Sequence, residues 1–293
     1  MSSTAHGTTP YYYVPHPSRH PAMAAFGLFL VILGAGQWIN GEEWGKYPLF
    51  AGLIWFLVVL YQWFSEAIHE SESGQFGHKI DLSYRWSMTW FIFSEVMFFG
   101  AFFTALWWAR SHSLPELGSL ENALLWPDFK AVWPSAVAGA TASPAGIVEP
   151  FQTMGPFWLP TINTALLLTS GVTLTIAHHA LQHGDRSKTI KFMWMTVILG
   201  LVFLFVQGYE YAHAWGDLNL KLSSGVYGST FYMLTGFHGF HVFVGIVWLI
   251  CAYIAALRGA YTQENYLRLE LAGLYWHFVD LVWVLLFTIV YLM

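Results

Sequence analysis

The chain has 293 residues, of which 56% are hydrophobic and only 10% are charged, and its formal net charge at pH 7 is −5. Ordinary soluble domains carry about 25% charged residues, and here the apolar residues come in blocks of about twenty separated by short polar segments. This pattern predicts an all-α polytopic membrane protein and excludes a soluble protein with one large core. The charges are spread over separate segments without a basic patch, so we expect no binding to nucleic acid.

The first 21 residues form a polar tail rich in proline, tyrosine and histidine. The tail lacks a charged segment followed by an apolar one, so we expect no cleaved signal peptide. The next segment predicts a membrane helix over 22–39, with Gly27, Gly34 and Gly36 on a face suited to close helix packing.

Long apolar runs predict seven membrane-spanning helices in all. Their expected bounds are 22–39, 49–64, 86–108, 159–181, 190–212, 230–257 and 271–292. A polar, charged connection at 65–85 separates the first two runs from the others. We therefore expect a two-helix bundle within 22–70 and a five-helix bundle within 71–293.

One long loop, 110–157, separates the third predicted helix from the fourth. It contains six prolines and a stretch of Ala, Gly, Ser and Pro at 136–146. Proline at this density breaks helices, so the loop is predicted to be an irregular surface excursion.

The distribution of Lys and Arg predicts the orientation, because cytoplasmic segments of membrane proteins carry an excess of these residues. The N-terminal side of the predicted topology carries Arg19, Lys79, Arg85, Arg186, Lys188, Lys191, Arg258 and Arg268. The opposite side carries half as many, at Lys46, Arg110, Lys130 and Lys221. We therefore expect a cytoplasmic N-terminus and a C-terminus on the outer side of a bacterial-type plasma membrane.

Glu95 is the only ionisable residue of the third predicted helix, and it lies about 14 Å along that helix from Trp86. A bare carboxylate at that depth would cost several kcal/mol. We therefore expect Glu95 to be protonated, or hydrogen-bonded to a neighbouring helix.

Other ionisable residues fall at similar depth in the sixth and seventh predicted helices. His238 and His241 are three residues apart and share one helical face, as do His277 and Asp280. Together with Glu95 they are predicted to form a polar layer near the bilayer centre. One interpretation is that these groups hold helices together; the other is a proton-handling or ion-binding site.

No motif for metal, haem or nucleotide binding is recognisable, although the chain has 13 histidines. The single cysteine, Cys251, offers neither a disulfide nor a thiolate metal site within the chain. We expect no catalytic centre and no metal on this chain.

Four extended motifs occur along the chain: SEVMFFGAFF at 94–103, AHHALQHGDR at 177–186, GVYGSTFYMLTGFHGFHVFVG at 225–245 and YWHFVDLVW at 275–283. In this order they resemble subunit III of cytochrome c oxidase. The similarity runs from about Pro21 to the C-terminus, interrupted by the long loop. Because four motifs occur in the family's order within a seven-helix pattern, the match is highly specific.

The resemblance implies an accessory subunit without haem or copper, bound directly to subunit I of a proton-pumping oxidase. Subunit II, and in some complexes small subunits, complete the assembly, which oxidises cytochrome c and reduces oxygen to water. Haem and copper are expected on the partner subunits. In this family subunit III supports proton uptake by subunit I and protects its active site from inactivation during turnover. The carbodiimide-reactive glutamate of the family's SEV motif matches Glu95.

The resemblance also implies a V-shaped cleft between the two-helix and five-helix bundles, filled by phospholipids. Trp55 and Trp63, aromatic residues near the membrane interface, are candidates for its border. Histidines and a carboxylate predicted on the cytoplasmic side could gather protons near the channel mouth of subunit I. These candidates are His20, His69, His78, His183 and Asp185. The alternative is that each is an ordinary solvated group.

Two features depart from the family. The second helix ends in YQWFSE at 61–66, without the arginine that animal members carry shortly after this motif, and the loop at 110–157 is longer than theirs. An autonomous transporter or proton channel is a different reading, but no inverted repeat supports it. A quinol-oxidising relative also stays open, because another subunit selects the electron donor.

Overall fold

The structure, a computed structural model, describes residues 16–73, 78–125, 129, 131–134, 151–262 and 266–293. It divides into two compact units, Met1–Ser87 and Met88–Met293. Most of the predicted N-terminal tail and the stretch at 136–146 lie outside the described residues. The predicted cleft between two bundles stays a prediction.

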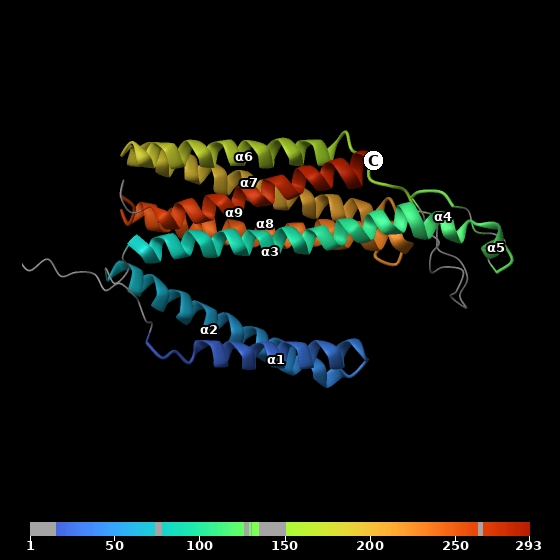
Figure 1. The fold of residues 1–293 in the computed structure, drawn as a ribbon, viewed down its shortest axis with the longest axis horizontal. Helices are drawn as coiled ribbons and strands as arrows, with labels where there is room; N and C mark the ends of the chain where they lie inside the picture. Colours follow the sequence, from blue (N-terminus) through green and yellow to red (C-terminus); the bar gives the residue numbers. More distant parts are fainter. Residues whose placement is uncertain (1–15, 74–77, 126–128, 130, 135–150, 263–265) are drawn as a thin grey trace, which may run out of the picture. The chain divides into compact units, whose positions relative to one another are not determined.

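Seven helices of the described residues are long and apolar enough to cross a membrane (Figure 1). They are α1 (His20–Ile39), α2 (Lys46–Glu72), α3 (His78–Trp108), α6 (Leu159–Gln182), α7 (Arg186–Gly216), α8 (Gly225–Leu257) and α9 (Leu267–Leu286). The prediction of an all-α membrane protein with seven spans is confirmed.

Several helices extend beyond the apolar runs that predicted them. Helix α2 continues to Glu72 and α3 begins at His78, so most of the charged connection at 65–85 is helical. Glu, Lys and Arg are good helix formers, and a helix need not end where it leaves the hydrocarbon. Asp81 and Arg85, one turn apart on α3, place their charged atoms 3.7 Å apart.

The first part of the predicted irregular loop is also helical, so that prediction is wrong there. Helix α3 continues into a π-helical segment, Ala109–Ser113, followed by the short helices α4 (Leu114–Leu117) and α5 (Leu120–Ala123). Pro115 lies directly after the π-helical segment, and the helix runs through it without a break. Proline therefore does not end the helix here, and the change to π-helical geometry directly before it fits the missing backbone N–H.

In the first unit, α1 packs closely against α2 through glycines, and a 3₁₀ turn, Glu43–Gly45, joins the two helices. A β-carbon at Gly34 would overlap the backbone of Leu49, so only glycine permits this approach. Gly27 is buried in the same contact, whereas a β-carbon at Gly36 would meet nothing within 4 Å. The predicted close-packing face therefore includes Gly27 and Gly34 but not Gly36.

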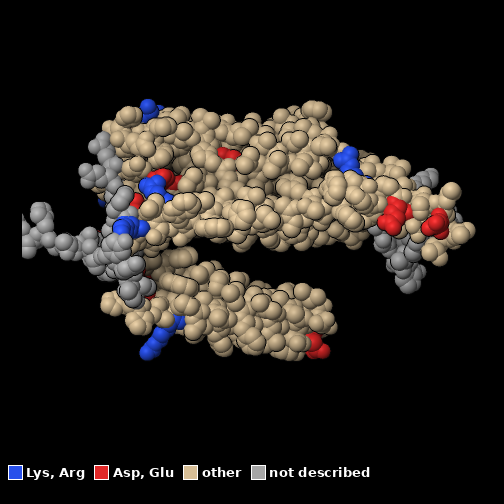
Figure 2. All heavy atoms as spheres, in the orientation of Figure 1, with Lys and Arg blue, Asp and Glu red and all other residues tan. Residues whose placement is uncertain are grey.

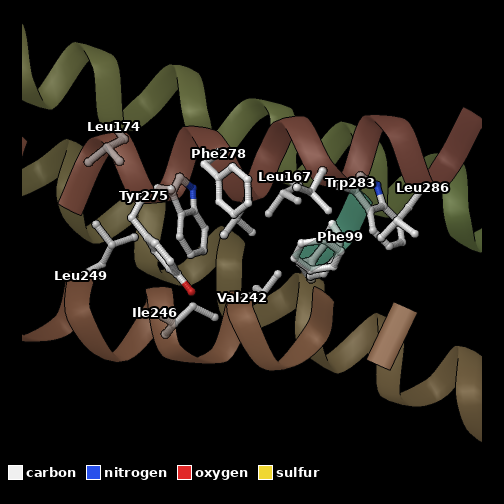
Figure 3. Close-up of a cluster of buried hydrophobic side chains, with 14 of the residues drawn as sticks. Phe99, Leu167, Leu174, Val242, Ile246, Leu249, Tyr275, Phe278, Trp283 and Leu286 are labelled. Atoms are coloured by element: carbon white, nitrogen blue, oxygen red, sulfur yellow. The ribbon is translucent and has the colours of Figure 1, made fainter. Parts of the chain in front are cut away.

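The second unit has a continuous core in which large aromatic rings fill the space between helices (Figure 3). Trp276 and Trp283 of α9 are fully buried. Their indole N–H groups donate to Ser170 Oγ at 2.9 Å and Thr164 Oγ1 at 3.0 Å, both on α6. Hydroxyl partners satisfy donors that would otherwise be costly inside a membrane protein.

A tight turn joins α6 to α7 at one end of this unit. Gly184 adopts a positive φ of 77°, which glycine tolerates without steric cost. Asp185 caps α7 by accepting a hydrogen bond from the Lys188 backbone N–H at 2.9 Å. Arg186 then donates to the Leu257 carbonyl at 2.7 Å, which ties this turn to the last residue of α8.

Charged side chains on the visible surface gather near the helix ends (Figure 2). Between those ends each unit shows a nearly uncharged surface, as the hydrocarbon of a bilayer requires.

Candidate functional site

Glu95 of α3 and His241 of α8 form a direct pair within the second unit. Glu95 Oε2 lies 2.8 Å from His241 Nε2, and both side chains are largely shielded from solvent. The sequence predicted that Glu95 is protonated or hydrogen-bonded to a neighbouring helix, without identifying the partner.

The hydrogen bond on the other side of the His241 ring determines how many protons the pair holds. His241 Nδ1 lies 2.6 Å from the Phe237 carbonyl oxygen, which can only accept, so Nδ1 carries a proton. One further proton then joins Nε2 to Glu95, held either by the carboxyl or by the ring. Either arrangement leaves the pair with no net charge, which removes most of the cost of burying a carboxylate.

Aromatic rings surround this pair. The rings of Phe98 and Phe99 lie 5.9 and 5.0 Å from the His241 ring, measured between centroids. Tyr275 of α9 donates its hydroxyl to the His241 carbonyl at 3.2 Å. The pair thus joins α3 to α8, with α9 supporting the backbone at His241.

His238 belongs to the predicted polar layer but lies in a separate place. It is fully buried, with its ring stacked on Trp283 at 5.1 Å and edge-on to Phe203 at 5.9 Å. Neither of its ring nitrogens has a hydrogen-bond partner among the described residues. The spacing of three residues therefore does not bring His238 to Glu95.

His277 and Asp280 form another separate group on α9. His277 Nδ1 lies 3.6 Å from Asp280 Oδ2, and His277 Nε2 lies 3.3 Å from Thr175 Oγ1 of α6. The Asp280 side chain is 9% exposed and that of His277 47%. Asp280 Oδ2 occupies the space beside Gly171 of α6 that a β-carbon would take, so alanine there would require the carboxylate to move.

A buried carboxyl that the sequence did not single out lies on α7. Glu210 is fully buried and accepts a hydrogen bond from the Tyr291 hydroxyl at 2.6 Å. Gln207, one turn before Glu210, donates to the Thr235 carbonyl at 3.1 Å. The hydroxyl of Tyr211, the residue after Glu210, lies 2.6 Å from the Thr235 hydroxyl. Glu210 lies six residues before the end of α7, a position that gives no sign of burial by itself. The spacing of Gln207, Glu210 and Tyr211 on one helical face is the signal that could have indicated burial.

The predicted proton-collecting residues fall in both units. In the first unit His20 lies 2.8 Å from Glu66 and stacks on Trp63 at 6.1 Å, while His69 is exposed on α2. In the second unit, His183 and Asp185 are exposed at the α6–α7 turn.

His78 begins α3, and its side chain lies outside the described residues. Close to the α6–α7 turn, burial raises the pKa of Tyr261 to about 12, and the nearby Arg268 partly opposes this shift.

The two candidate lipid-contacting tryptophans lie on α2. Trp55 donates its indole N–H to the Met23 carbonyl of α1 at 2.9 Å, and Trp63 forms the stack with His20. Both rings keep a large exposed apolar surface, 42% of Trp55 and 36% of Trp63.

The described residues contain no group of three or more His, Cys, Asp or Glu side chains that could hold a metal ion. Among the pairs above, Glu95–His241 joins the most distant parts of the sequence.

Comparison with known proteins agrees with the four motifs. The family model described as cytochrome c oxidase subunit III matches residues 10–129 and 120–293. A probable cytochrome c oxidase subunit 3 of Rickettsia felis is 35% identical over 96% of this chain and 94% of its own length. The cytochrome c oxidase subunit 3 of Oncorhynchus mykiss is 36% identical over 99% of this chain and 98% of its own length. The chain therefore belongs to the cytochrome c oxidase subunit III family.

Proposed function

We propose that this chain is a non-redox subunit that supports proton uptake by subunit I of a proton-pumping cytochrome c oxidase and protects its catalytic site during turnover. Haem and copper belong to the partner subunits in this proposal, subunit I is the direct neighbour, and subunit II and small subunits complete the assembly. The membrane is a bacterial-type plasma membrane, with the N-terminus in the cytoplasm.

The observation that carries this proposal is the Glu95–His241 pair. The carboxyl most deeply placed in α3 is hydrogen-bonded to an imidazole on another helix, and the pair as a whole is neutral. Such a pair can hold α3 against α8 without placing a net charge in the membrane, and this role involves no electron transfer.

Two further features support an auxiliary role. Exposed histidines and carboxylates lie near one end of α2 and near one end of α6, where such groups can collect protons at a membrane surface. Trp55 and Trp63 present exposed apolar rings on α2 that phospholipid acyl chains would cover.

The test compares the purified oxidase complex with and without this chain. Removing the chain should leave the haem content and the optical spectrum unchanged. It should slow oxygen uptake as the pH rises, because protons become scarce, and it should reduce the number of turnovers before inactivation. Rates and lifetimes equal to those of the intact complex would contradict the proposal.

Two controls separate the proposal from other functions. The isolated chain should show no haem absorption, because it is proposed to bind no haem. It should also move no protons when reconstituted alone into liposomes, whereas a transporter would do so.

A further inference from the structure

A groove in the second unit is lined by residues that the proposed function does not use. It encloses about 520 Å³, within the range of small-molecule sites, and we name it the Arg110 groove. Its walls include Phe103, Trp107, Arg110, Tyr227, Thr230 and Ile289.

Both π-helical segments of the described residues border this groove. Arg110 and Ser111 come from the segment Ala109–Ser113 after α3, and Ile289 comes from Phe287–Leu292 after α9. Wide π turns are uncommon and occur often at functional sites. The walls of this groove are therefore formed by the widened ends of α3 and α9.

The polarity of the groove changes along α3. Phe103, Trp107 and Arg110 are spaced four and three residues apart, so they follow one face of the helix from apolar to charged. Trp107 is half-exposed, as tryptophans at the boundary between hydrocarbon and headgroups commonly are. Arg110 then lies at headgroup level, and Phe103 lies two turns below Arg110, at the level of acyl chains.

The cation at the mouth of the groove faces no lining carboxylate. Arg110 lies over the Trp133 ring with its guanidinium carbon 5.8 Å from the centroid, which holds the side chain in place. The described lining residues provide the hydroxyls of Ser111 and Thr230 but no acidic side chain. A guanidinium in this setting binds a phosphate through two parallel N–H···O hydrogen bonds.

We propose that the Arg110 groove binds one phospholipid molecule, with its phosphodiester on Arg110 and the upper part of an acyl chain between Phe103 and Ile289. The charge of Arg110 selects the phosphate, and the apolar lower walls select the chain. This site lies wholly within the second unit and is independent of Trp55 and Trp63 on α2.

The experiment uses the whole oxidase complex in membranes that contain a phospholipid with a photoreactive diazirine beside the glycerol. After irradiation and digestion, peptide mass spectrometry should find lipid adducts on peptides covering Phe103–Ser111 or Phe287–Met293. No adduct on either peptide in the wild-type complex would overturn the proposal.

Two variants test the polar and apolar contacts separately. Arg110→Gln should reduce these adducts roughly tenfold or more, because charge-assisted hydrogen bonds to the phosphate are lost. Ile289→Trp should reduce them similarly by filling the groove without changing charge. Undiminished labelling in either variant would overturn the proposal.

Matched controls place the same changes elsewhere in the second unit. Arg258→Gln alters an exposed arginine after α8, and Ile254→Trp adds a ring on the exposed side of that helix, so neither should change the labelling. A photoreactive amino acid at Thr104 gives a further check. Capture of a partner subunit there, instead of lipid, would show that protein fills the groove and would overturn the proposal.

Discussion

At the scale of single residues, the hydrogen bond between His241 Nδ1 and the Phe237 carbonyl decides the chemistry of Glu95. Because Nδ1 is occupied as a donor, only Nε2 can interact with the carboxyl, and the two groups share one proton. The depth of Glu95 along α3 predicted its need for a partner, but no sequence pattern identifies His241 over His238, which is three residues away on the same helix.

Replacing Glu95 by Gln should preserve the pair, because the amide N–H can donate to Nε2 of a neutral His241 ring. We expect the variant to stay in the complex, with oxygen uptake and turnover lifetime nearly unchanged. Glu95→Leu leaves Nε2 unpaired and should cost about 1–3 kcal/mol. Thermal release of this chain from the purified complex measures both effects, and early release of Glu95→Gln would show that the ionised form is needed.

Gly171 offers a second residue-scale test, because Asp280 Oδ2 fills the space beside its α-carbon. Gly171→Ala should destabilise the unit by roughly 1–3 kcal/mol through overpacking. Shortening the partner in Gly171→Ala/Asp280→Ser should recover part of this loss. Equal instability of the single and double variants, measured by thermal unfolding in detergent, would contradict the contact.

At the scale of helices, apolar runs predict the existence of a span better than its ends. The seven spans were predictable because about twenty apolar residues are needed to cross a bilayer. Their extensions, such as the last turns of α2 and the first turns of α3, consist of polar residues for which hydropathy gives no signal. Likewise, Pro115 looks like a helix breaker, but the helix runs through it after the π-helical segment Ala109–Ser113.

Two glycines of α1, Gly34 and Gly36, provide a matched pair of substitutions that tests the packing of α1 against α2. Gly34→Val should separate α1 from α2, because a β-carbon there overlaps the backbone near Leu49. Gly36→Val makes the same change where nothing lies within 4 Å, so it should be nearly neutral. Limited proteolysis of the connection between the helices would report the separation. Similar proteolysis of the two variants would contradict the packing described for α1.

At the scale of the whole molecule, family membership and the seven spans agree with what the motifs implied. Pairings such as Glu210 with Tyr291, 81 residues apart, could not be read from the sequence. Periodicity indicates which side of a helix is polar, but the identity of its neighbour depends on how the helices assemble.

The bias of Lys and Arg predicts a cytoplasmic N-terminus and an outer C-terminus. Alkaline phosphatase, which is active only outside the cytoplasm, should therefore be active when fused after Met293. Green fluorescent protein at the same position should be dark after export through the general secretory route. Fusions at the α6–α7 turn, near Asp185, should give the opposite pattern. Reversed results would invert the topology.

The neutrality of the Glu95–His241 pair has a consequence for an energised membrane. Moving a full elementary charge through 100 mV involves about 2.3 kcal/mol, but a proton passing between two atoms 2.8 Å apart crosses only a small fraction of that potential. Respiratory voltage should therefore barely alter which atom holds the proton. The contact between α3 and α8 would keep the same strength whether the cell is respiring or at rest.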